Sequence, residues 1–274
     1  MKETIHVEVL LPVAISATIK GGQKILEVYQ SGAFDVQLKK DNTPVTLADR
    51  LSHSTIKKNL DNTNLPFLSE EGKEIPYIER KKWDLFWLVD PLDGTKEFIG
   101  RNGEFTVNIA LIRKKEPILG VIYVPVQKIL YFGAENTGSY KVDLGVLSQY
   151  PDNIDGWLNE GKKLPVVKRK EYLRIVGSRS HMNTETKNFI EEIKKQYGRV
   201  EFVSIGSSLK LCMVAEGLAY LYPRLGPTME WDTAAGHAIA KFAGCSVTVY
   251  GKDIPLEYNK ENLLNPWFIV KSGR

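Results

Sequence analysis

The chain has 274 residues, 43% of them hydrophobic and 26% charged, and a formal net charge of +4. This composition is typical of a globular protein, and it excludes a long disordered or fibrous chain. The positive charge is weak and scattered, which argues against a nucleic-acid-binding protein but is compatible with a small anionic substrate.

The first predicted element is a helix that starts near residues 9–17, VLLPVAISA. Glu3 and Glu8 precede this apolar run and no basic segment does, which argues against a signal peptide. Apolar residues then continue at helical spacing, so we expect one helix, interrupted or loosened at Gly21 and Gly22. No uninterrupted apolar run of about 18 residues is present, so we expect a cytoplasmic protein, with loose membrane association left open.

The rest of the first half predicts a second helix and then an antiparallel meander. Thr46 and Asp49 fit a capping box that opens a helix ending near Leu60. Apolar runs separated by turn signals follow. The expected strands lie in residues 66–72, where a loop follows the strand, then in 83–90, 105–112 and 118–126, and ILYFGAE continues the same rhythm.

The second half alternates between strand and helix patterns, which predicts a layered α/β arrangement. Residues 141–170 are polar and rich in turn signals, so we expect a surface excursion that contains a lobe boundary. We therefore expect an N-terminal α+β lobe over 1–170 and a C-terminal α/β lobe over 171–274. The expected helices are 183–197, 207–217 and 233–243, with strands at LRIVGSRS, VEFVSI, LAYLYPR and CSVTVY. We expect Cys212 and Cys245 to be reduced and semi-buried, because neither has metal-ligand spacing.

Several acidic residues stand at the ends of predicted elements rather than on exposed faces. Each of them alone could cap a helix or shape a turn. Together they indicate a site of hard oxygen ligands, which suits Mg²⁺. Crowded carboxylates repel one another without cations, so more than one divalent metal is expected if they converge. These acids are Asp49, Glu70, Glu71, Asp90, Asp93 and Asp232.

The stretch DPLDGTKEFI, residues 90–99, carries the strongest signal. Pro91 is expected to stop the preceding strand, because proline cannot donate to a ladder. Gly94 permits a backbone conformation closed to other residues, and Thr95 supplies a hydroxyl on the same loop. The carbonyl of Leu92 could add another oxygen ligand.

This stretch, preceded by LSEEG and followed by WDTAAG, resembles the inositol monophosphatase superfamily of Mg²⁺-dependent, lithium-sensitive phosphatases. The segments KEFIGRNGEFTVNIAL, SRSH, GSSLK and LYPRLGPTMEWDTAAGHA look like its CysQ-type 3'(2'),5'-bisphosphate nucleotidases. Such enzymes cut 3'-phosphoadenosine 5'-phosphate to AMP and phosphate. The resemblance covers roughly residues 10–270 and implies the family's fold, an α+β protein with layers in the order α/β/α/β/α.

The resemblance also implies roles for individual residues. Two or three Mg²⁺ ions would be held by Glu70, Asp90, the Leu92 carbonyl, Asp93 and Asp232. Asp49 and Thr95 would orient the nucleophilic water, and Glu71 would lie behind the ligands. The nucleotide would contact Gly94, Thr95, His181, Ser207, Lys210, Arg224 and Asp232.

The residues also favour a cationic site for the second phosphate. Lys210 stands near a predicted helix N-terminus, and Arg224 presents a fork that suits phosphate. Lys210 could instead be a solvated helix lysine, and His181 a structural histidine.

Other functions stay open alongside the nucleotidase. An inositol monophosphatase or another sugar phosphatase would use the same acids, but a monophosphorylated polyol offers no second anion to Lys210 and Arg224. A non-catalytic binding protein would be expected to lose a ligand acid or Thr95, and none is lost. A nucleic-acid-binding module would need a basic stripe that is missing. 3'-Phosphoadenosine 5'-phosphosulfate and its desulfated form both remain open as substrates.

Overall fold

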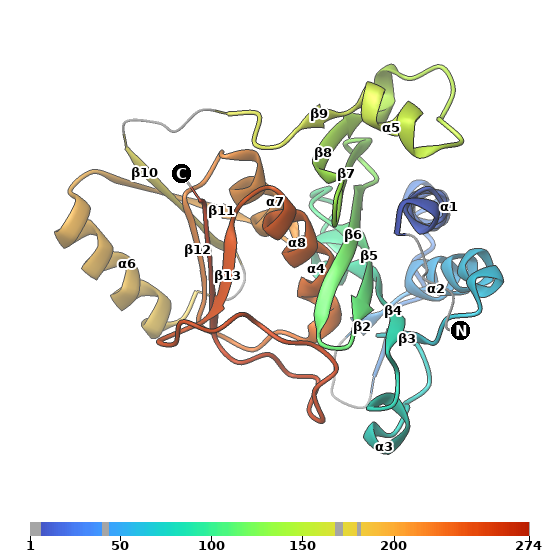
Figure 1. Ribbon diagram of the computed structural model, residues 1–274, viewed down its shortest axis with the longest axis horizontal. Helices are drawn as coiled ribbons and strands as arrows, with labels where there is room; N and C mark the ends of the chain where they lie inside the picture. Colours follow the sequence, from blue (N-terminus) through green and yellow to red (C-terminus); the bar gives the residue numbers. More distant parts are fainter. Residues whose placement is uncertain (1–6, 40–43, 168–171, 180–181, 274) are drawn as a thin grey trace.

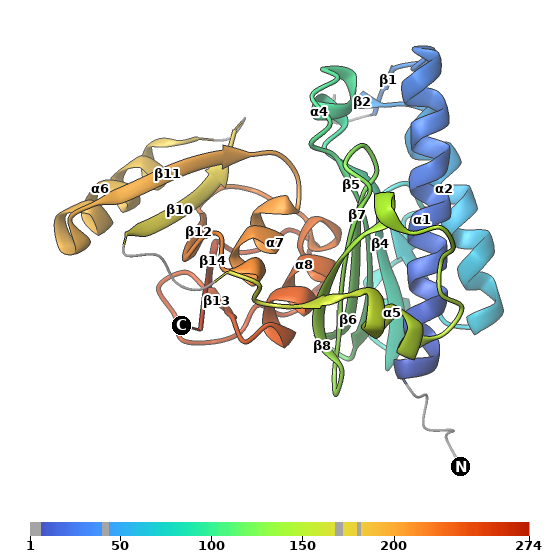
Figure 2. The same ribbon diagram turned by 90° about the horizontal axis from the view of Figure 1, so that it is seen from above.

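The computed structural model describes residues 7–39, 44–167, 172–179 and 182–273. Its helices and sheets form five layers in the order α/β/α/β/α, which confirms the fold that the motifs imply (Figures 1 and 2). A helix pair covers one face of a seven-stranded sheet, and a second helix pair separates that sheet from a five-stranded one. A single helix lies on the far side of the five-stranded sheet.

The outer helix pair is α1 (Val7–Ser31) and α2 (Leu47–Leu60). The expected interruption of α1 at Gly21 and Gly22 is wrong, because the helix is continuous and both glycines are buried. A Cβ at Gly21 would lie 2.8 Å from Ile56 Cγ1 of α2, and one at Gly22 would lie 2.4 Å from Tyr123 Cδ1 of the sheet. These glycines therefore let α1 approach both neighbours closely.

By length and composition, α1 is apolar enough to cross a membrane, and 56% of its apolar window is buried inside the fold. Its buried side chains belong to one cluster with α2 and the seven-stranded sheet. Helix α1 therefore has the packing of a core helix.

The seven-stranded sheet has the order β3-β4-β5-β6-β7-β8-β9, in which β3 and β4 are parallel and the other pairs antiparallel. Its strands are β3 (Phe67–Ser69), β4 (Leu85–Asp93), β5 (Thr106–Arg113), β6 (Glu116–Val124), β7 (Ile129–Ala134), β8 (Gly138–Asp143) and β9 (Lys162–Lys163). The expectation that Pro91 ends its strand is wrong, since β4 continues to Asp93. The pairing with β5 shifts register between Asp90 and Asp93, and such a bulge tolerates a proline.

Part of the segment 141–170, which the sequence left unassigned, extends this sheet through β8 and β9. Between those strands it forms η2 (Leu144–Val146) and α5 (Ile154–Glu160), and Trp157 of α5 joins the cluster beside α1. Residues 168–171 lie outside the described residues, so the lobe boundary near residue 170 stays a prediction.

The second sheet has the order β11-β10-β12-β14-β13, and the predicted alternation is found. Its strands are β10 (Leu173–Ser178), β11 (Val200–Ile205), β12 (Leu221–Arg224), β13 (Ser246–Val249) and β14 (Phe268–Lys271). The helices are α6 (Thr184–Tyr197) outside and α7 (Leu209–Glu216) and α8 (Glu230–Phe242) between the sheets. Strand β14 was not predicted. Cys245 is partly buried, as expected, whereas Cys212 is fully buried rather than semi-buried.

Short elements complete the described chain and connect the main layers. They are β1 (Gln37–Leu38), β2 (Pro44–Val45), η1 (Asp61–Thr63), α3 (Tyr77–Arg80) and α4 (Thr95–Ile99).

Helix α8 lies directly on the seven-stranded sheet at two glycines. Gly120 of β6 and Gly133 of β7 face each other across the ladder. A Cβ at Gly120 would lie 2.2 Å from the carbonyl oxygen of Ala235, and one at Gly133 would lie 3.1 Å from Ile239 Cα. The backbone of α8 therefore approaches the sheet more closely than side chains at these positions would allow.

We expect Gly120→Ala to lower the free energy of unfolding by about 1–3 kcal/mol, because the added methyl group overpacks the contact with α8. Gly226→Ala is a suitable control, since its methyl group would meet only Asn183 Nδ2 at 3.9 Å and should change stability by less than about 0.5 kcal/mol. Urea unfolding of both variants measures the difference. Equal stability of the two variants would contradict the proposed close contact.

Candidate active site

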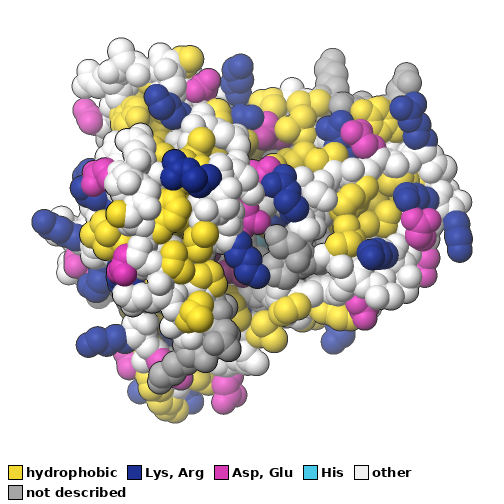
Figure 3. Space-filling view, turned by 180° about the vertical axis from the view of Figure 1, so that it is seen from behind, with side chains coloured by type: hydrophobic (Ala, Val, Ile, Leu, Met, Phe, Trp, Pro, Cys, Tyr) yellow, Lys and Arg dark blue, Asp and Glu magenta, His cyan; other side chains and the backbone are white. Residues whose placement is uncertain are grey.

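A pocket of about 590 Å³ opens between the two sheets and is lined by residues of both. In the space-filling view, Lys and Arg side chains flank a hollow between the two halves of the molecule, where acidic side chains are visible (Figure 3). Most of the predicted site residues line this pocket: Glu70, Asp90, Leu92, Asp93, Gly94, Thr95, Ser207, Lys210, Arg224 and Asp232.

Three carboxylates meet on the floor of the pocket. Glu70 follows β3, Asp90 lies in β4, and Asp232 lies in the first turn of α8. One oxygen of each lies within 4.8 Å of the others, as a shared metal ion would require. Asp93 is not part of this trio but lines the same pocket, where Asn108 Nδ2 donates to its Oδ2 at 3.4 Å.

Local backbone geometry fixes the orientation of these acids. Asp90 Oδ1 accepts the amide of Leu92 at 3.0 Å across the bulge of β4. Asp232 Oδ2 accepts the amide of Met229 at 2.9 Å and the hydroxyl of Thr228 at 2.7 Å. Asp232 therefore caps its helix and faces the pocket at once, so one side chain has both the structural and the site role.

Burial and mutual repulsion make these carboxyl groups hard to ionise without a cation. Burial, together with the charges of Glu70, Asp93 and Asp232, raises the pKa of Asp90 well above its usual range. Burial and the charge of Asp232 also raise the pKa of Asp93 to about 7. Burial raises the pKa of Glu70 to about 7, although Lys39 opposes the shift. A bound divalent cation would remove this repulsion, so the donor set fits a hard metal ion.

Lys39 is a site residue that the sequence analysis missed. It lies directly after β1, and its Nζ contacts Glu70 Oε1 at 2.8 Å and Glu71 Oε1 at 2.5 Å. Although burial lowers the pKa of Lys39, the two carboxylates raise it above its usual value. No local pattern in the sequence links this lysine to acids more than thirty residues away.

Asp49 and Thr95 are brought together from different elements. Thr95 Oγ1, at the start of α4, donates to Asp49 Oδ1 at 3.4 Å. The other oxygen of Asp49 accepts the amide of Thr46 at 2.7 Å, which completes the predicted capping box of α2. Burial raises the pKa of Asp49 to about 6. Gly94, at φ +96°, allows the sharp turn that presents Thr95.

The opposite wall of the pocket is cationic. Lys210 is only 6% exposed, so the interpretation as a solvated helix lysine is wrong. Its Nζ donates to the carbonyl oxygens of Ser207 and Ile205, and burial lowers its pKa to about 8, with Asp93 opposing and Arg224 adding to the shift. Among the residues that the structure describes, Ser207 Oγ and Arg224 Nε are buried and have no hydrogen-bond partner.

Two unpartnered polar atoms in one pocket are costly unless a ligand satisfies them. Arg224 donates through another nitrogen to the carbonyl of Pro227, which leaves Nε available. His181 lies outside the described residues, so its predicted contact with a nucleotide is not described.

A buried polar cluster that the sequence analysis missed connects the two walls. Ser208 Oγ donates to Asn108 Oδ1 at 2.8 Å and lies 2.8 Å from Thr106 Oγ1. Thr106 and Asn108 belong to β5 of the first sheet, whereas Ser208 precedes α7. Alternating polar residues within the apolar strand FTVNIALI were the one sequence signal for this cluster.

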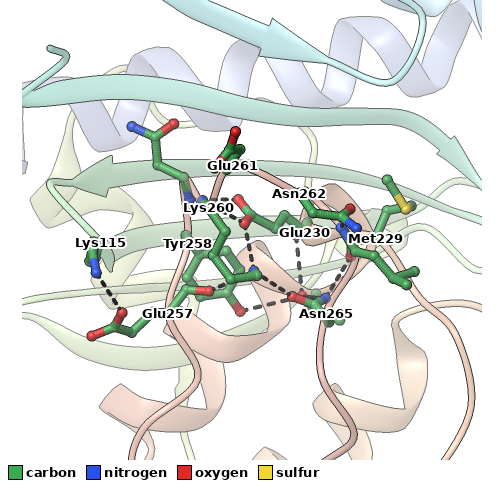
Figure 4. Close-up of polar contacts among 12 residues, drawn as sticks. Lys115, Met229, Glu230, Glu257, Tyr258, Lys260, Glu261, Asn262 and Asn265 are labelled. Carbon is green, nitrogen blue, oxygen red and sulfur yellow. Dashed lines mark hydrogen bonds and ion pairs between the residues drawn. The ribbon is translucent and has the colours of Figure 1, made fainter. Parts of the chain in front are cut away.

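A loop over residues 257–265 holds the start of α8 in place (Figure 4). The fully buried Glu230 accepts Lys260 Nζ at 2.6 Å and the amide of Asn259 at 2.6 Å. Asn265 Nδ2 donates to the carbonyl of Met229 at 2.8 Å. Since Asp232 lies two residues after Glu230, these contacts also fix the position of its carboxylate.

Comparison with known proteins agrees with this geometry. The inositol monophosphatase family matches residues 6–269. The 3'(2'),5'-bisphosphate nucleotidase CysQ of Escherichia coli (strain K12) is 46% identical over 257 residues, which are 91% of this chain and 94% of that protein. The protein of the same name from Haemophilus influenzae is 35% identical over 269 residues, or 96% of this chain and 93% of that protein.

Solved structures show the same relationship. The crystal structure of CysQ from Bacteroides thetaiotaomicron, a bacterial member of the inositol monophosphatase family, is 49% identical and matches with a TM-score of 0.90, covering 98% of this chain and 99% of that one. Extragenic suppressor protein SuhB from Bartonella henselae is 25% identical with a TM-score of 0.73, covering 96% of this chain and 94% of that one. The chain therefore belongs to the inositol monophosphatase family, and its predicted resemblance to the CysQ-type members is confirmed.

Proposed function

We propose that the protein is a Mg²⁺-dependent phosphatase that hydrolyses the 3'-phosphate of adenosine 3',5'-bisphosphate to give AMP and phosphate. The observation that carries the proposal is one pocket with a carboxylate floor and a cationic wall that holds two unpartnered polar atoms. The first feature suits a metal-assisted phosphoryl transfer, and the second suits a further phosphate on the same substrate. Relatives named 3'(2'),5'-bisphosphate nucleotidase support this substrate class.

The carboxylate floor is the proposed metal site. A Mg²⁺ ion held there would supply positive charge for polarising phosphoryl oxygens, for acidifying a water and for stabilising the leaving 3'-oxygen. We assign its ligands to Glu70, Asp90, the Leu92 carbonyl, Asp93 and Asp232. The raised pKa values of Glu70, Asp90 and Asp93 support this assignment, because a cation stabilises the ionised carboxylates against burial.

Asp49 and Thr95 are assigned to the attacking water. Asp49 is held by the capping box of α2, and its second oxygen accepts from Thr95. With its proton directed to Asp49, the Thr95 hydroxyl keeps lone pairs with which it accepts a hydrogen bond from water. This pair therefore orients the water and receives its proton, directly or through the hydroxyl. Gly94 allows the substrate to approach this turn closely.

Ser207, Lys210 and Arg224 are assigned to the second phosphate, at the 5' position. Within the described part of the chain, Ser207 Oγ and Arg224 Nε are buried side-chain atoms without a hydrogen-bond partner. Burial lowers the pKa of Lys210, and the nearby charges of Asp93 and Arg224 act on the same ammonium group. The proposed partner is thus a small nucleotide. The cytoplasmic location and the contact of His181 with the nucleotide stay predictions.

Phosphate release in the presence of Mg²⁺ tests the proposed activity. We expect adenosine 3',5'-bisphosphate to be hydrolysed with a kcat/KM at least about a hundredfold above that for inositol 1-phosphate, because only the nucleotide presents a second anion to the cationic wall. Lithium should inhibit, and chelation of Mg²⁺ should abolish turnover. A preference for inositol 1-phosphate would contradict the proposed substrate and favour an inositol monophosphatase or another sugar phosphatase.

We expect Asp90→Asn to lower kcat/KM at least about a hundredfold, since it removes a charged ligand from the carboxylate floor. Without Mg²⁺ the variant should be at least as stable as the parent, because a source of repulsion is gone. Thermal unfolding should also show that Mg²⁺ no longer stabilises it to the same extent. Asp253→Asn, at an exposed position that does not line the pocket, is the control. Undiminished Mg²⁺-dependent turnover would refute the ligand assignment.

Lys210→Ala and Arg224→Ala test the second phosphate site. Each should raise the KM for adenosine 3',5'-bisphosphate about tenfold to a hundredfold, as expected for the loss of a hydrogen bond to a charged group. The effect on adenosine 3'-monophosphate should be much smaller. Lys241→Ala removes an exposed lysine of α8 that pairs with Glu116 and serves as the control. An unchanged KM for the bisphosphate would exclude the replaced residue from the site.

A further inference from the structure

Glu104 connects the first sheet to the loop that carries the cationic wall. It stands two residues before β5, and its side chain is 19% exposed. Its Oε2 accepts the amide of Gly206 at 2.8 Å, and its Oε1 accepts Arg179 Nη2 at 2.6 Å. Neither Glu104 nor Arg179 is among the described residues that line the pocket. Glu104 therefore acts from behind the wall and not through contact with a ligand.

The backbone before Glu104 is shaped to deliver it to this position. The amide of Glu104 donates to Asn102 Oδ1 at 2.9 Å, and Gly103 has a φ of +76°. Gly206 lies so close that a Cβ there would meet the carbonyl oxygen of Glu104 at 2.9 Å. The two segments thus contact each other through backbone as well as through the carboxylate.

The loop that is hydrogen-bonded to Glu104, residues 206–208, has an energetically unfavourable backbone conformation. Ser207 has a φ of +43°, a region that a residue with a side chain adopts only when its surroundings hold it there. The carbonyl of Ser207 accepts from Lys210, and its buried hydroxyl has no hydrogen-bond partner among the described residues. On the C-terminal side, Ser208 is anchored to Asn108. On the N-terminal side, the anchor is the bond from Gly206 to Glu104.

The charge of Glu104 would repel a phosphate if it were uncompensated. Arg179 pairs with the carboxylate, so the local net charge stays close to neutral while one oxygen still accepts the Gly206 amide. Glu104 can therefore hold the loop without opposing an anion in the pocket.

We propose that Glu104 is a positioning residue for substrate selection: it holds the Gly206–Ser208 loop so that Ser207 and Lys210 can receive the phosphate that is not hydrolysed. The proposal rests on the proposed function for the identity of that phosphate. It predicts that loss of Glu104 weakens recognition of the second phosphate and leaves the carboxylate floor, and hence the chemical step, intact.

The test compares steady-state kinetics on adenosine 3',5'-bisphosphate and adenosine 3'-monophosphate with Mg²⁺. We expect Glu104→Ala to raise the KM for the bisphosphate about tenfold, with kcat changed by less than about twofold and kcat/KM for the monophosphate unchanged. Glu104→Gln keeps an acceptor for the Gly206 amide, so its KM for the bisphosphate should stay close to that of the parent protein. The matched control is Glu135→Ala, which breaks the ion pair with Arg113 outside the pocket. It should change the kinetic constants for neither substrate.

An equal loss of kcat/KM on both substrates, or no loss of kcat/KM on the bisphosphate, would overturn the inference. Thermal unfolding of each variant verifies that it is folded, and Glu104→Gln decides the outcome if Glu104→Ala is not. If the parent protein hydrolyses neither nucleotide, the proposed function fails. Calorimetric titration with AMP then decides this inference separately, because unchanged AMP affinity in Glu104→Ala would overturn it and about tenfold weaker binding would support it.

Discussion

The direct contact between the backbone of α8 and the first sheet sets the geometry on which the rest of the molecule depends. Two facing glycines, Gly120 and Gly133, remove the side chains that would hold the helix away. The same helix also packs toward the second sheet, so its height above the first sheet determines the separation of the two. Asp232 lies in the first turn of this helix, and the close approach brings its carboxylate to Glu70 after β3 and Asp90 of β4.

The pocket concentrates groups that are unfavourable in isolation. Buried carboxylates face one another, and a buried lysine has a lowered pKa. Two buried polar atoms also lack a hydrogen-bond partner among the described residues. The surrounding structure compensates by rigid anchoring. The anchors are the capping box of Asp49, the bonds that Asp232 accepts from Met229 and Thr228, and the contacts of Glu230. Strain and unsatisfied polarity at a site that is held by well-packed elements are typical of binding and catalytic centres.

The sequence predicted what depends on local patterns. The capping box of Thr46 and Asp49, the alternation of the second half and the acids around DPLDGT all have local signals. Prediction from the sequence failed where contacts between distant segments determine the structure. Gly21 and Gly22 were expected to interrupt the helix, but their missing side chains allow α1 to pack against its neighbours. Pro91 was expected to end its strand, but the bulge in β4 accommodates it. Lys39, Asn108 and Glu104 were missed because their partners lie far away in the sequence.

The packing of α1 has a consequence for how the chain reaches its fold during synthesis. Helices α1 and α2 are adjacent in the sequence and can pair early, with Gly21 against Ile56. The other face of α1 covers Tyr123 and its neighbours in β6, which leave the ribosome much later. Until then a helix as apolar as a membrane span has no partner for that face. The nascent chain therefore exposes this apolar face of α1 until β6 has been synthesised, and protection of the growing polypeptide matters most before the meander is complete.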